Sequence, residues 1–225
     1  MDKVITCFNK RPDALVRLIC FPRAGGGSVH YARWAKTLNN SFEGREGRAK
    51  EPFYQNMQEI VYEPFALFGH SFGAMTCFAF AEHVKNVYNL EPIHMFLSGA
   101  SAPYSEARLQ APRRIHLSDQ EFLVWVTSVG GTPPEILASA EFAKLFLPAL
   151  KAVICVAENY RWVSKRNRQT SVSFFNVADH QHPSFICATV QMLPGTHFYL
   201  KEDANEKYIL DYITKHLEMA EMDYL

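Results

Sequence analysis

The distribution of apolar positions divides most of the chain into short uninterrupted runs and longer stretches of helical periodicity. The runs are rich in aliphatic and aromatic residues, and they predict strands at residues 15–21, 65–69, 93–98, 172–178 and 189–193. Because these runs are apolar throughout instead of alternating, both faces of their sheet are expected to be covered. The predicted class is α/β, with a mostly parallel sheet and helices on both faces.

Helical periodicity follows several of the predicted strands. Residues 28–38 form an amphipathic pattern behind Ser28, which is a favourable N-cap residue. Residues 74–85 follow the second strand directly, and residues 203–218 place an apolar face on a closing helix. The order of strand, turn, helix and strand is that of crossover units in a parallel sheet.

Residues 102–150 differ from the rest, because helical patterns occur there without any strand signal. Ser118 and Glu121 form a capping box that opens one helix, and residues 134–150 predict another. We therefore predict a single domain, residues 1–225, in which residues 102–150 are a helical lid over the sheet.

Composition adds exclusions to this picture. The 225 residues include 23 basic and 23 acidic ones, so no global field favours nucleic acid or an anionic membrane. No secretory pattern opens the chain, and no apolar run approaches the roughly 18 residues that cross a bilayer. The 5 cysteines are widely spaced without a CxxC pair, which argues against a disulfide framework or a zinc site. We expect a cytoplasmic monomer without a metal site.

The segment GHSFG places Ser71 between Gly69 and Gly73, where a predicted strand meets a predicted helix. The GxSxG pattern is weak by itself, but this context is the one that a nucleophile elbow requires. Glycine on both sides removes side chains that would collide with the backbone in so tight a turn. The alternative is a serine that only caps the helix. We interpret Ser71 as a catalytic nucleophile, because a helix N-terminus favours developing negative charge.

A serine nucleophile needs a base, and His197 has the fitting position. It lies in LPGTHFYL, in a short loop between the last predicted strand and the last predicted helix, whereas His70 is expected to pack beside the site. The third member should be a carboxylate, and Asp179 ends a predicted strand between the serine and the histidine. Asp179 could instead be a solvated loop residue, and Glu202 and Asp203 are nearby substitutes.

Acyl transfer also needs backbone N–H donors for the oxyanion. Phe72, which follows the nucleophile, is expected to supply one donor, and Ala24 in the loop FPRAGGGS the other. A glycine-rich loop that opens a helix could instead cradle a phosphate. This loop lacks GxGxxG and the Lys-Ser/Thr pair of a P-loop, so we prefer the oxyanion interpretation.

Large apolar side chains of the predicted lid could line a tunnel for an acyl chain. We expect substrate contacts from Phe122, Trp125 and Phe146, with Phe142 and Leu147 near them. Ordinary core contacts between helices are the alternative explanation of such a stripe.

Several segments occur in the order seen in one known family, among them LICFPRAGGGSVHYARW, PFALFGHSFGAM, GGTPPEIL and LPGTHFYL. Together they resemble the type II thioesterases, in particular the animal medium-chain fatty acid synthase thioesterases, also called oleoyl-ACP hydrolases. The resemblance covers about residues 7–217. It implies an α/β-hydrolase fold with Ser71 and His197 as nucleophile and base. It also implies that fatty acids are released from the phosphopantetheine thioester of the acyl carrier protein of fatty acid synthase, with no metal or redox cofactor.

Departures from the family pattern leave alternatives open. Residues 39–52 are polar and carry isolated glycines, so no core strand is predicted there. Residues 57–69 leave no room for the helix usually placed ahead of the elbow, and residues 151–187 match the family poorly around Asp179. We therefore predict a sheet shortened by one strand and one helix. A catalytically silent module that binds acyl chains or the carrier protein is the second hypothesis, and a general carboxylesterase is the third.

Overall fold

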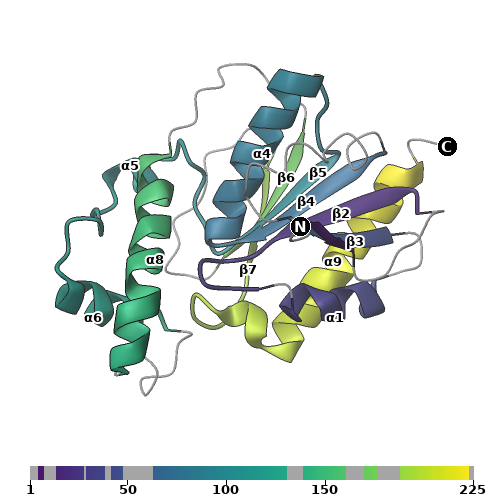
Figure 1. The fold of residues 1–225 in the computed structure, drawn as a ribbon. Coiled ribbons are helices and arrows are strands. Elements are labelled where there is room, and N and C mark those ends of the chain that lie inside the picture. The colour runs from purple at the N-terminus through teal and green to yellow at the C-terminus, as the bar shows by residue number, and fades with distance from the viewer. Residues whose placement is uncertain are drawn as a thin grey trace.

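One sheet runs through the part of the chain that the computed structural model describes, which is residues 5–7, 14–27, 29–38, 42–47, 63–130, 139–160, 170–176 and 188–222. The sheet has 7 strands in the order β1-β3-β2-β4-β5-β6-β7 (Figure 1). β1 is antiparallel to β3, and every other neighbouring pair is parallel. The strands are β1 Ile5–Cys7, β2 Val16–Phe21, β3 Phe42–Gly47, β4 Phe65–His70, β5 His94–Ser98, β6 Ser171–Asn176 and β7 Ala188–Met192.

Helices cover both faces of the sheet. Figure 1 shows α4 on one side and α1 and α9 on the other, while α5, α6 and α8 gather at one end. Their bounds are α1 Val29–Thr37, α4 Phe72–Tyr88, α5 Glu106–Gln110, α6 Asp119–Val129, α8 Ala140–Asn159 and α9 Asp203–Met222, with a short 3-10 helix η1 at Tyr199–Lys201. The arrangement is the predicted α/β class.

Side chains of the central strands alternate between two apolar layers. On β4, Phe65 and Leu67 belong to the layer that α4 covers, whereas Ala66 and Phe68 belong to the layer under α1 and α9. All six residues of β4 are buried. This burial on both faces explains why the strand is apolar throughout, as the sequence indicated.

The predicted strands and helices are confirmed with shifts of a few residues at their ends. The capping box of Ser118 and Glu121 is present at the start of α6. α8 continues beyond the predicted end at residue 150 to Asn159, although Pro148 lies inside it. The N-cap prediction for Ser28 falls outside the described residues.

The prediction that residues 39–52 hold no core strand is wrong, and so is the expected loss of one strand. β3 has the polar sequence FEGREG, yet it pairs with β2 from Val16↔Phe42 to Cys20↔Glu46, and with β1 on its other side. Backbone pairing satisfies its N–H and C=O groups whatever its side chains are, and tertiary context overrides strand propensity. The expected loss of a helix before residue 65 concerns residues outside the described ranges.

The helical region of α5, α6 and α8 occupies the segment predicted as a lid. Within the described residues, no helix is long and apolar enough to cross a membrane. The partition of residues 1–225 into one domain with a lid at residues 102–150 stays a prediction.

Candidate active site

Ser71 is the single residue between the end of β4 and the start of α4, where the chain turns sharply. Its backbone has φ 56° and ψ −116°, a conformation that costs a non-glycine residue free energy and is typical of strained functional turns. The N–H of Ser71 donates a hydrogen bond of 2.7 Å to the carbonyl of Ser98, at the end of β5. The turn is therefore fastened to the neighbouring strand, and the serine lies at the N-terminus of α4.

The two glycines that flank Ser71 are required by packing. A Cβ at Gly69 would lie 2.3 Å from the carbonyl oxygen of Gly73. A Cβ at Gly73 would lie 2.0 Å from the carbonyl oxygen of Phe21, at the end of β2. Both separations are far below van der Waals contact, so α4 can approach the sheet this closely only with glycine at both positions.

His197 lies within hydrogen-bonding distance of the serine, although 126 positions separate them in the chain. Its Nε2 is 3.0 Å from Ser71 Oγ. The loop that carries it turns at Gly195, whose φ is 114° and whose Cβ, if present, would lie 2.7 Å from Glu202 Oε1. Asn205 holds the loop, because its Nδ2 donates to the carbonyls of Pro194 and Tyr199 at 3.0 and 3.1 Å. The predicted nucleophile and base are thus brought together.

The predicted acid cannot be placed in the same way, because Asp179 lies outside the described residues and its role stays a prediction. The two substitutes have other positions: Glu202 Oε2 accepts from Asn205 Nδ2 at 3.2 Å, and Asp203 is the first residue of α9.

One predicted oxyanion donor follows the serine in the chain, and the other lines the same cavity. Phe72 is the first residue of α4, where a backbone N–H has no acceptor within the helix. Ala24 lines the same cavity as Ser71. Their part in binding the oxyanion stays a prediction.

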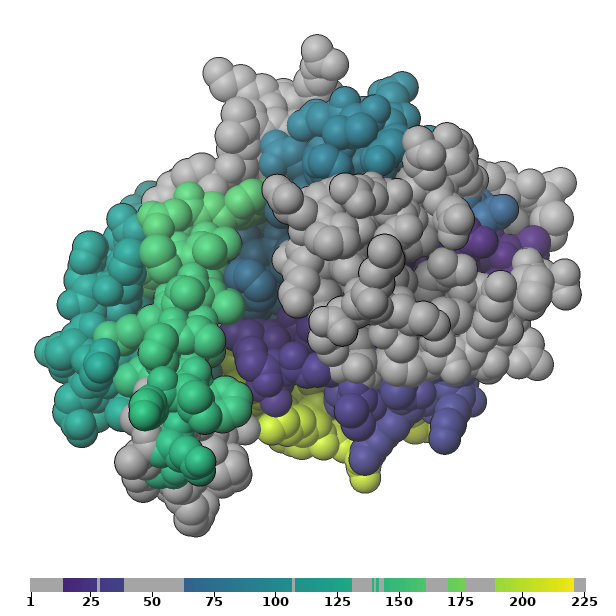
Figure 2. Space-filling model, viewed as in Figure 1, coloured from purple at the N-terminus to yellow at the C-terminus, as the bar shows by residue number. Residues whose placement is uncertain are grey.

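A cavity of about 530 Å³ opens at Ser71 and His197 and extends toward α6 and α8. We call it the acyl cavity, and its apolar wall comes from Trp125, Val126, Val129, Leu150 and Ile154. Figure 2 shows α6 and α8 at one end of the molecule, beside the purple surface of the residues that precede α1. An apolar wall that meets a few convergent polar groups is typical of a site for a largely apolar ligand.

The predicted substrate residues take different positions around this cavity. Trp125 lines it, while Phe122 is fully buried behind, with its ring 5.3 Å from that of Trp125. Phe146 is 57% exposed on α8 and is not among the described residues that line the cavity. Leu147 is buried between α6 and α8, and the side chain of Phe142 lies outside the description.

Comparison with known proteins agrees with this arrangement, since residues 16–217 match the family model described as "Thioesterase domain". The chain belongs to the thioesterase domain family. It is similar to "S-acyl fatty acid synthase thioesterase, medium chain" of Anas platyrhynchos, 38% identical over 99% of this chain and 100% of that protein. The rat protein with the same description is 36% identical over 98% of this chain and 95% of its own length.

A solved structure extends the similarity from sequence to fold. "Crystal structure of human thioesterase 2" superposes with a TM-score of 0.70 and 29% identity over 92% of this chain and 97% of that chain. The alignment with the duck protein spans 251 positions, more than the 225 residues of this chain, so that relative has internal residues without a counterpart here. The chain is therefore internally shorter, although β3 is present.

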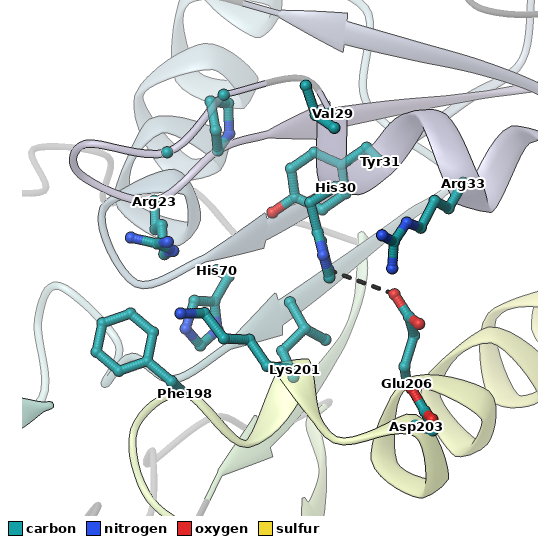
Figure 3. A pocket seen from close by; sticks show the side chains of 14 residues that line it. Arg23, Val29, His30, Tyr31, Arg33, His70, Phe198, Lys201, Asp203 and Glu206 are labelled. Atoms are coloured by element: carbon teal, nitrogen blue, oxygen red, sulfur yellow. Dashed lines mark ion pairs between the residues drawn. The ribbon is translucent and has the colours of Figure 1, made fainter. Parts of the chain in front are cut away.

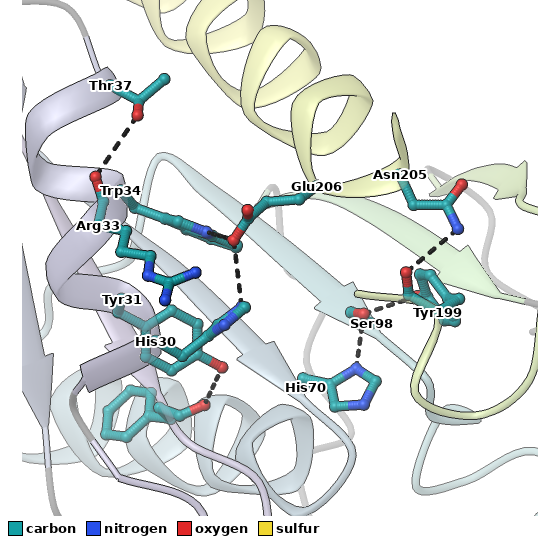
Figure 4. A network of polar contacts seen from close by, with 11 residues as sticks. His30, Tyr31, Arg33, Trp34, Thr37, His70, Ser98, Tyr199, Asn205 and Glu206 are labelled. Carbon is teal, nitrogen blue, oxygen red and sulfur yellow. Dashed lines mark hydrogen bonds and ion pairs between the residues drawn. The ribbon is translucent and has the colours of Figure 1, made fainter. Parts of the chain in front are cut away.

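A chain of hydrogen bonds through two hydroxyl groups, behind the site of this thioesterase, determines that Nδ1 of His70 carries a proton (Figure 4). Tyr199 Oη donates to the carbonyl of Phe175 at 2.6 Å and lies 2.6 Å from Ser98 Oγ. Since the phenol has a single proton, Ser98 donates to Tyr199. Ser98 Oγ then accepts at 2.8 Å from His70 Nδ1, which therefore carries a proton. Burial raises the pKa of Tyr199, so the phenol keeps its proton at neutral pH.

The His70 ring packs beside the imidazole of the predicted base, with the ring centroids of His70 and His197 5.2 Å apart. Gly99 leaves room for both rings: a Cβ there would lie 2.7 Å from His70 Cε1 and 3.3 Å from His197 Cε1. The sequence predicts the position of His70 beside the site, but Ser98, Gly99 and Tyr199 were not predicted as parts of it. Only Gly99, in the segment FLSGASAP after a predicted strand, carried a visible signal.

Proposed function

We propose that this thioesterase is a serine hydrolase that cleaves medium- to long-chain acyl thioesters carried by the phosphopantetheine of an acyl carrier protein. The observation that carries the proposal is the 3.0 Å contact between His197 Nε2 and Ser71 Oγ at the mouth of the acyl cavity. The printed descriptions of the duck and rat relatives, which name fatty acid synthase, support the substrate class.

The geometry supports a mechanism in two halves. In the first half, His197 Nε2 takes the proton of Ser71 Oγ while Oγ attacks the thioester carbonyl carbon. The N–H groups of Ala24 and Phe72 stabilise the oxyanion of the tetrahedral intermediate. The carbon–sulfur bond then breaks, and the imidazolium gives its proton to the leaving thiolate. Ser71 is left as an acyl ester.

In the second half, His197 takes a proton from water while the water oxygen attacks the acyl ester. The ester bond breaks, Ser71 Oγ regains a proton from the imidazolium, and the free fatty acid leaves. Asp179 would hold the imidazole in the correct orientation and stabilise its charged form. Protons and electron pairs balance with water as the only co-reactant, so the proposed reaction needs no metal or redox cofactor.

The proposed partner is the acyl carrier protein domain of fatty acid synthase, and the proposed location is the cytoplasm, where the chain would act as a monomer. Neither nucleic acid nor a membrane has a part in this proposal. The equal numbers of basic and acidic residues, 23 each, support that view.

Replacement of the nucleophile tests the function. Ser71→Ala should abolish hydrolysis of a decanoyl thioester, because no group would remain to form the acyl ester. The circular dichroism spectrum should be unchanged, which shows that the variant folds. Retained turnover in a folded Ser71→Ala protein would refute the serine mechanism.

Replacement of the predicted acid tests the remaining member of the triad. Asp179→Asn should lower kcat by up to about 10^4, because the imidazole would lose the partner that holds its tautomer. A change of only a few-fold in kcat would move this role to another carboxylate, and Glu202→Gln and Asp203→Asn would then identify it.

The chain is internally shorter than its duck relative, which favours a second candidate function: a catalytically silent module that binds acyl chains or the carrier protein. Such a module would bind a decanoyl thioester without cleaving it. A general carboxylesterase keeps the same chemistry, and it would hydrolyse p-nitrophenyl esters as efficiently as carrier-bound thioesters.

A further inference from the structure

A second cavity lies next to the acyl cavity and shares part of its wall. Its volume is about 340 Å³, and it is lined by the loop before α1, by the first turns of α1 and by residues between 198 and 206 (Figure 3). Arg23 and Phe198 line both cavities. His70 also lines the second one, so this cavity begins directly behind the ring that packs beside His197.

Cationic side chains surround this second cavity, namely Arg23, Arg33 and Lys201, and we call it the basic pocket. The guanidinium carbon of Arg23 and Nζ of Lys201 lie 5.0 and 5.1 Å from the centroid of the Phe198 ring. That ring is in turn 5.1 Å from the ring of His197. Arg23 and Lys201 therefore contact the ring of Phe198, which in turn contacts the ring of His197. Figure 3 shows that the side chain of Arg33 extends from α1 toward the cavity.

The carboxylates of the pocket lie on the side away from Phe198, as Figure 3 shows for Asp203 and Glu206. Glu206 is engaged with α1: its Oε1 accepts from Trp34 Nε1 at 2.7 Å and lies 3.5 Å from His30 Nε2 (Figure 4). The carboxylate of Glu206 thus lies at the contact between α1 and α9, whereas the end of the pocket at Phe198 carries the cations Arg23 and Lys201.

The charged groups of the pocket act on one another. Burial lowers the pKa of Lys201, and the nearby Arg23 lowers it further. Burial also lowers the pKa of His30, and Glu206 partly opposes this effect. The cations Arg23, Arg33 and Lys201 lower that pKa as well, which favours the neutral imidazole of His30. An anion bound among these cations would reduce their mutual repulsion.

We propose that the basic pocket binds the phosphate of the pantetheine arm that carries the thioester. This inference rests on the proposed function and names where that part of the substrate lies. Arginine and lysine are the side chains that recognise phosphate, and α1 begins in the wall of the pocket, where backbone N–H groups also favour anions. A carrier-bound arm and coenzyme A present the same phosphate chemistry at this position.

The two cavities then receive the two parts of the substrate. The acyl chain occupies the acyl cavity and remains there as the ester of Ser71. The thiol arm lies in the basic pocket and leaves through it after the carbon–sulfur bond breaks. Arg23 and Phe198, which line both cavities, form the wall at which these parts diverge.

The test compares kcat/KM for decanoyl thioesters that differ only in the arm: N-acetylcysteamine, pantetheine, phosphopantetheine, coenzyme A and holo-carrier protein. The native chain should prefer phosphopantetheine over pantetheine. Arg33→Gln and Lys201→Gln should each reduce this preference about fivefold, as expected for one partly exposed cation–phosphate contact. Lys36→Gln removes an exposed charge from the same helix as Arg33, outside the described lining of the pocket, and should keep the preference.

Inhibition provides a readout independent of turnover of the phosphorylated substrates. Free phosphopantetheine should inhibit hydrolysis of the N-acetylcysteamine thioester more strongly than free pantetheine does. In Lys201→Gln this difference should shrink by a similar factor of about five, since one of the cations is gone. Thermal unfolding midpoints equal to that of the native chain confirm that the variants fold.

The outcomes separate this inference from the function on which it rests. If the native chain, Arg33→Gln and Lys201→Gln preferred the phosphopantetheine thioester over the pantetheine thioester to the same extent, the phosphate site would be overturned. The proposed hydrolysis would not be affected by that result. Failure to cleave any of the thioesters, N-acetylcysteamine included, would contradict the proposed function. A preference lost in the variants with coenzyme A but not with the carrier protein identifies the coenzyme as the source of the phosphate, and the reverse identifies the carrier arm.

Discussion

Two regions that meet at Ser71 are built differently. The elbow region, from β4 into α4, belongs to the sheet core, where 16 of the described residues are buried and pack together on each face. The helical region of α5, α6 and α8 has a separate cluster in which 3 of the described residues are buried. Large apolar side chains are also exposed on its helices, namely Val124, Leu145, Phe146 and Val156.

Polar contacts compensate in part for the small cluster of the helical region. Glu158 on α8 accepts a hydrogen bond of 2.6 Å from the backbone N–H of Arg114. Tyr160, which follows α8, donates to Glu82 of α4 at 3.2 Å. The helices are thus tied to one another and to α4, but with much less buried apolar area than the sheet core has.

This difference suggests separate roles for the two regions, with the chemical step at the elbow and binding of the acyl chain at the helical region. The predicted nucleophile is held by backbone geometry beside the sheet core, as preorganised chemistry requires. The apolar wall of the acyl cavity comes from the part with fewer buried contacts, where local free energies of opening are lower. Changes in the elbow should therefore affect folding and kcat, and changes in the helical region should affect KM.

The largest effect is expected at the elbow. Gly73→Ala would place a Cβ 2.0 Å from the carbonyl oxygen of Phe21, so it should lower the free energy of unfolding by more than about 3 kcal/mol and remove activity. Gly27→Ala is the matched control, because a Cβ there meets nothing within 4 Å, and its effect on urea unfolding should stay within about 0.5 kcal/mol. Similar stabilities for the two variants would mean that the elbow is not packed as described.

A smaller effect is expected in the wall of the acyl cavity. Trp125→Ala should raise KM for a decanoyl thioester about tenfold with little change in kcat, because apolar contact with the chain is lost while Ser71 and His197 stay in place. KM for a butyryl thioester should change much less. Val124→Ala, on the same helix but 62% exposed, serves as control. A fall in kcat with unchanged KM would show that the two regions do not divide the work in this way.

The smallest effect concerns acid sensitivity of the sheet core. Burial, with a further contribution from His216, lowers the pKa of His94 to about 3. Above the ordinary histidine pKa of about 6.5, the His94 ring is neutral in both the folded and the unfolded chain. At lower pH the ring is protonated in the unfolded chain but stays neutral in the folded chain. Stability is therefore lost as pH falls from about 6.5 toward 3.

The measurement is urea unfolding of the native chain and of His94→Gln, which does not titrate and can keep the contact to Ser173. Between about pH 7.5 and about pH 5.5 the native chain should lose about 1.4 kcal/mol more than the variant. Parallel losses in both proteins would show that His94 is protonated in the folded state as well.

The strand-turn-helix order and the elbow could be predicted from the sequence because they depend on local signals. Apolar runs, flanking glycines and the loop of His197 are visible without tertiary information. β3 could not be predicted, since FEGREG is polar and its place in the sheet depends on pairing with β1 and β2. Pairing partners far away in the sequence leave no local pattern.

The site shows the same division. Ser71 and His197 were predicted from motif and context, and their contact confirms the geometry. The hydrogen bonds of Ser98 and Tyr199 were not predicted, because hydroxyl groups acquire their donors and acceptors only when β5, β6 and η1 come together. For the lid aromatics, helical spacing alone could not distinguish Trp125 in the cavity wall from Phe146 on the surface.

The claim that His197 activates Ser71 is tested most directly by labelling with a fluorophosphonate probe, which reacts with activated serine hydroxyls. Peptide mass spectrometry would locate the modified residue in the native chain, in Ser71→Ala and in His197→Gln. We predict rapid modification of the native chain at Ser71 and none at that position in either variant. A folded native chain that stays unlabelled, or a His197→Gln protein labelled at the native rate, would contradict it.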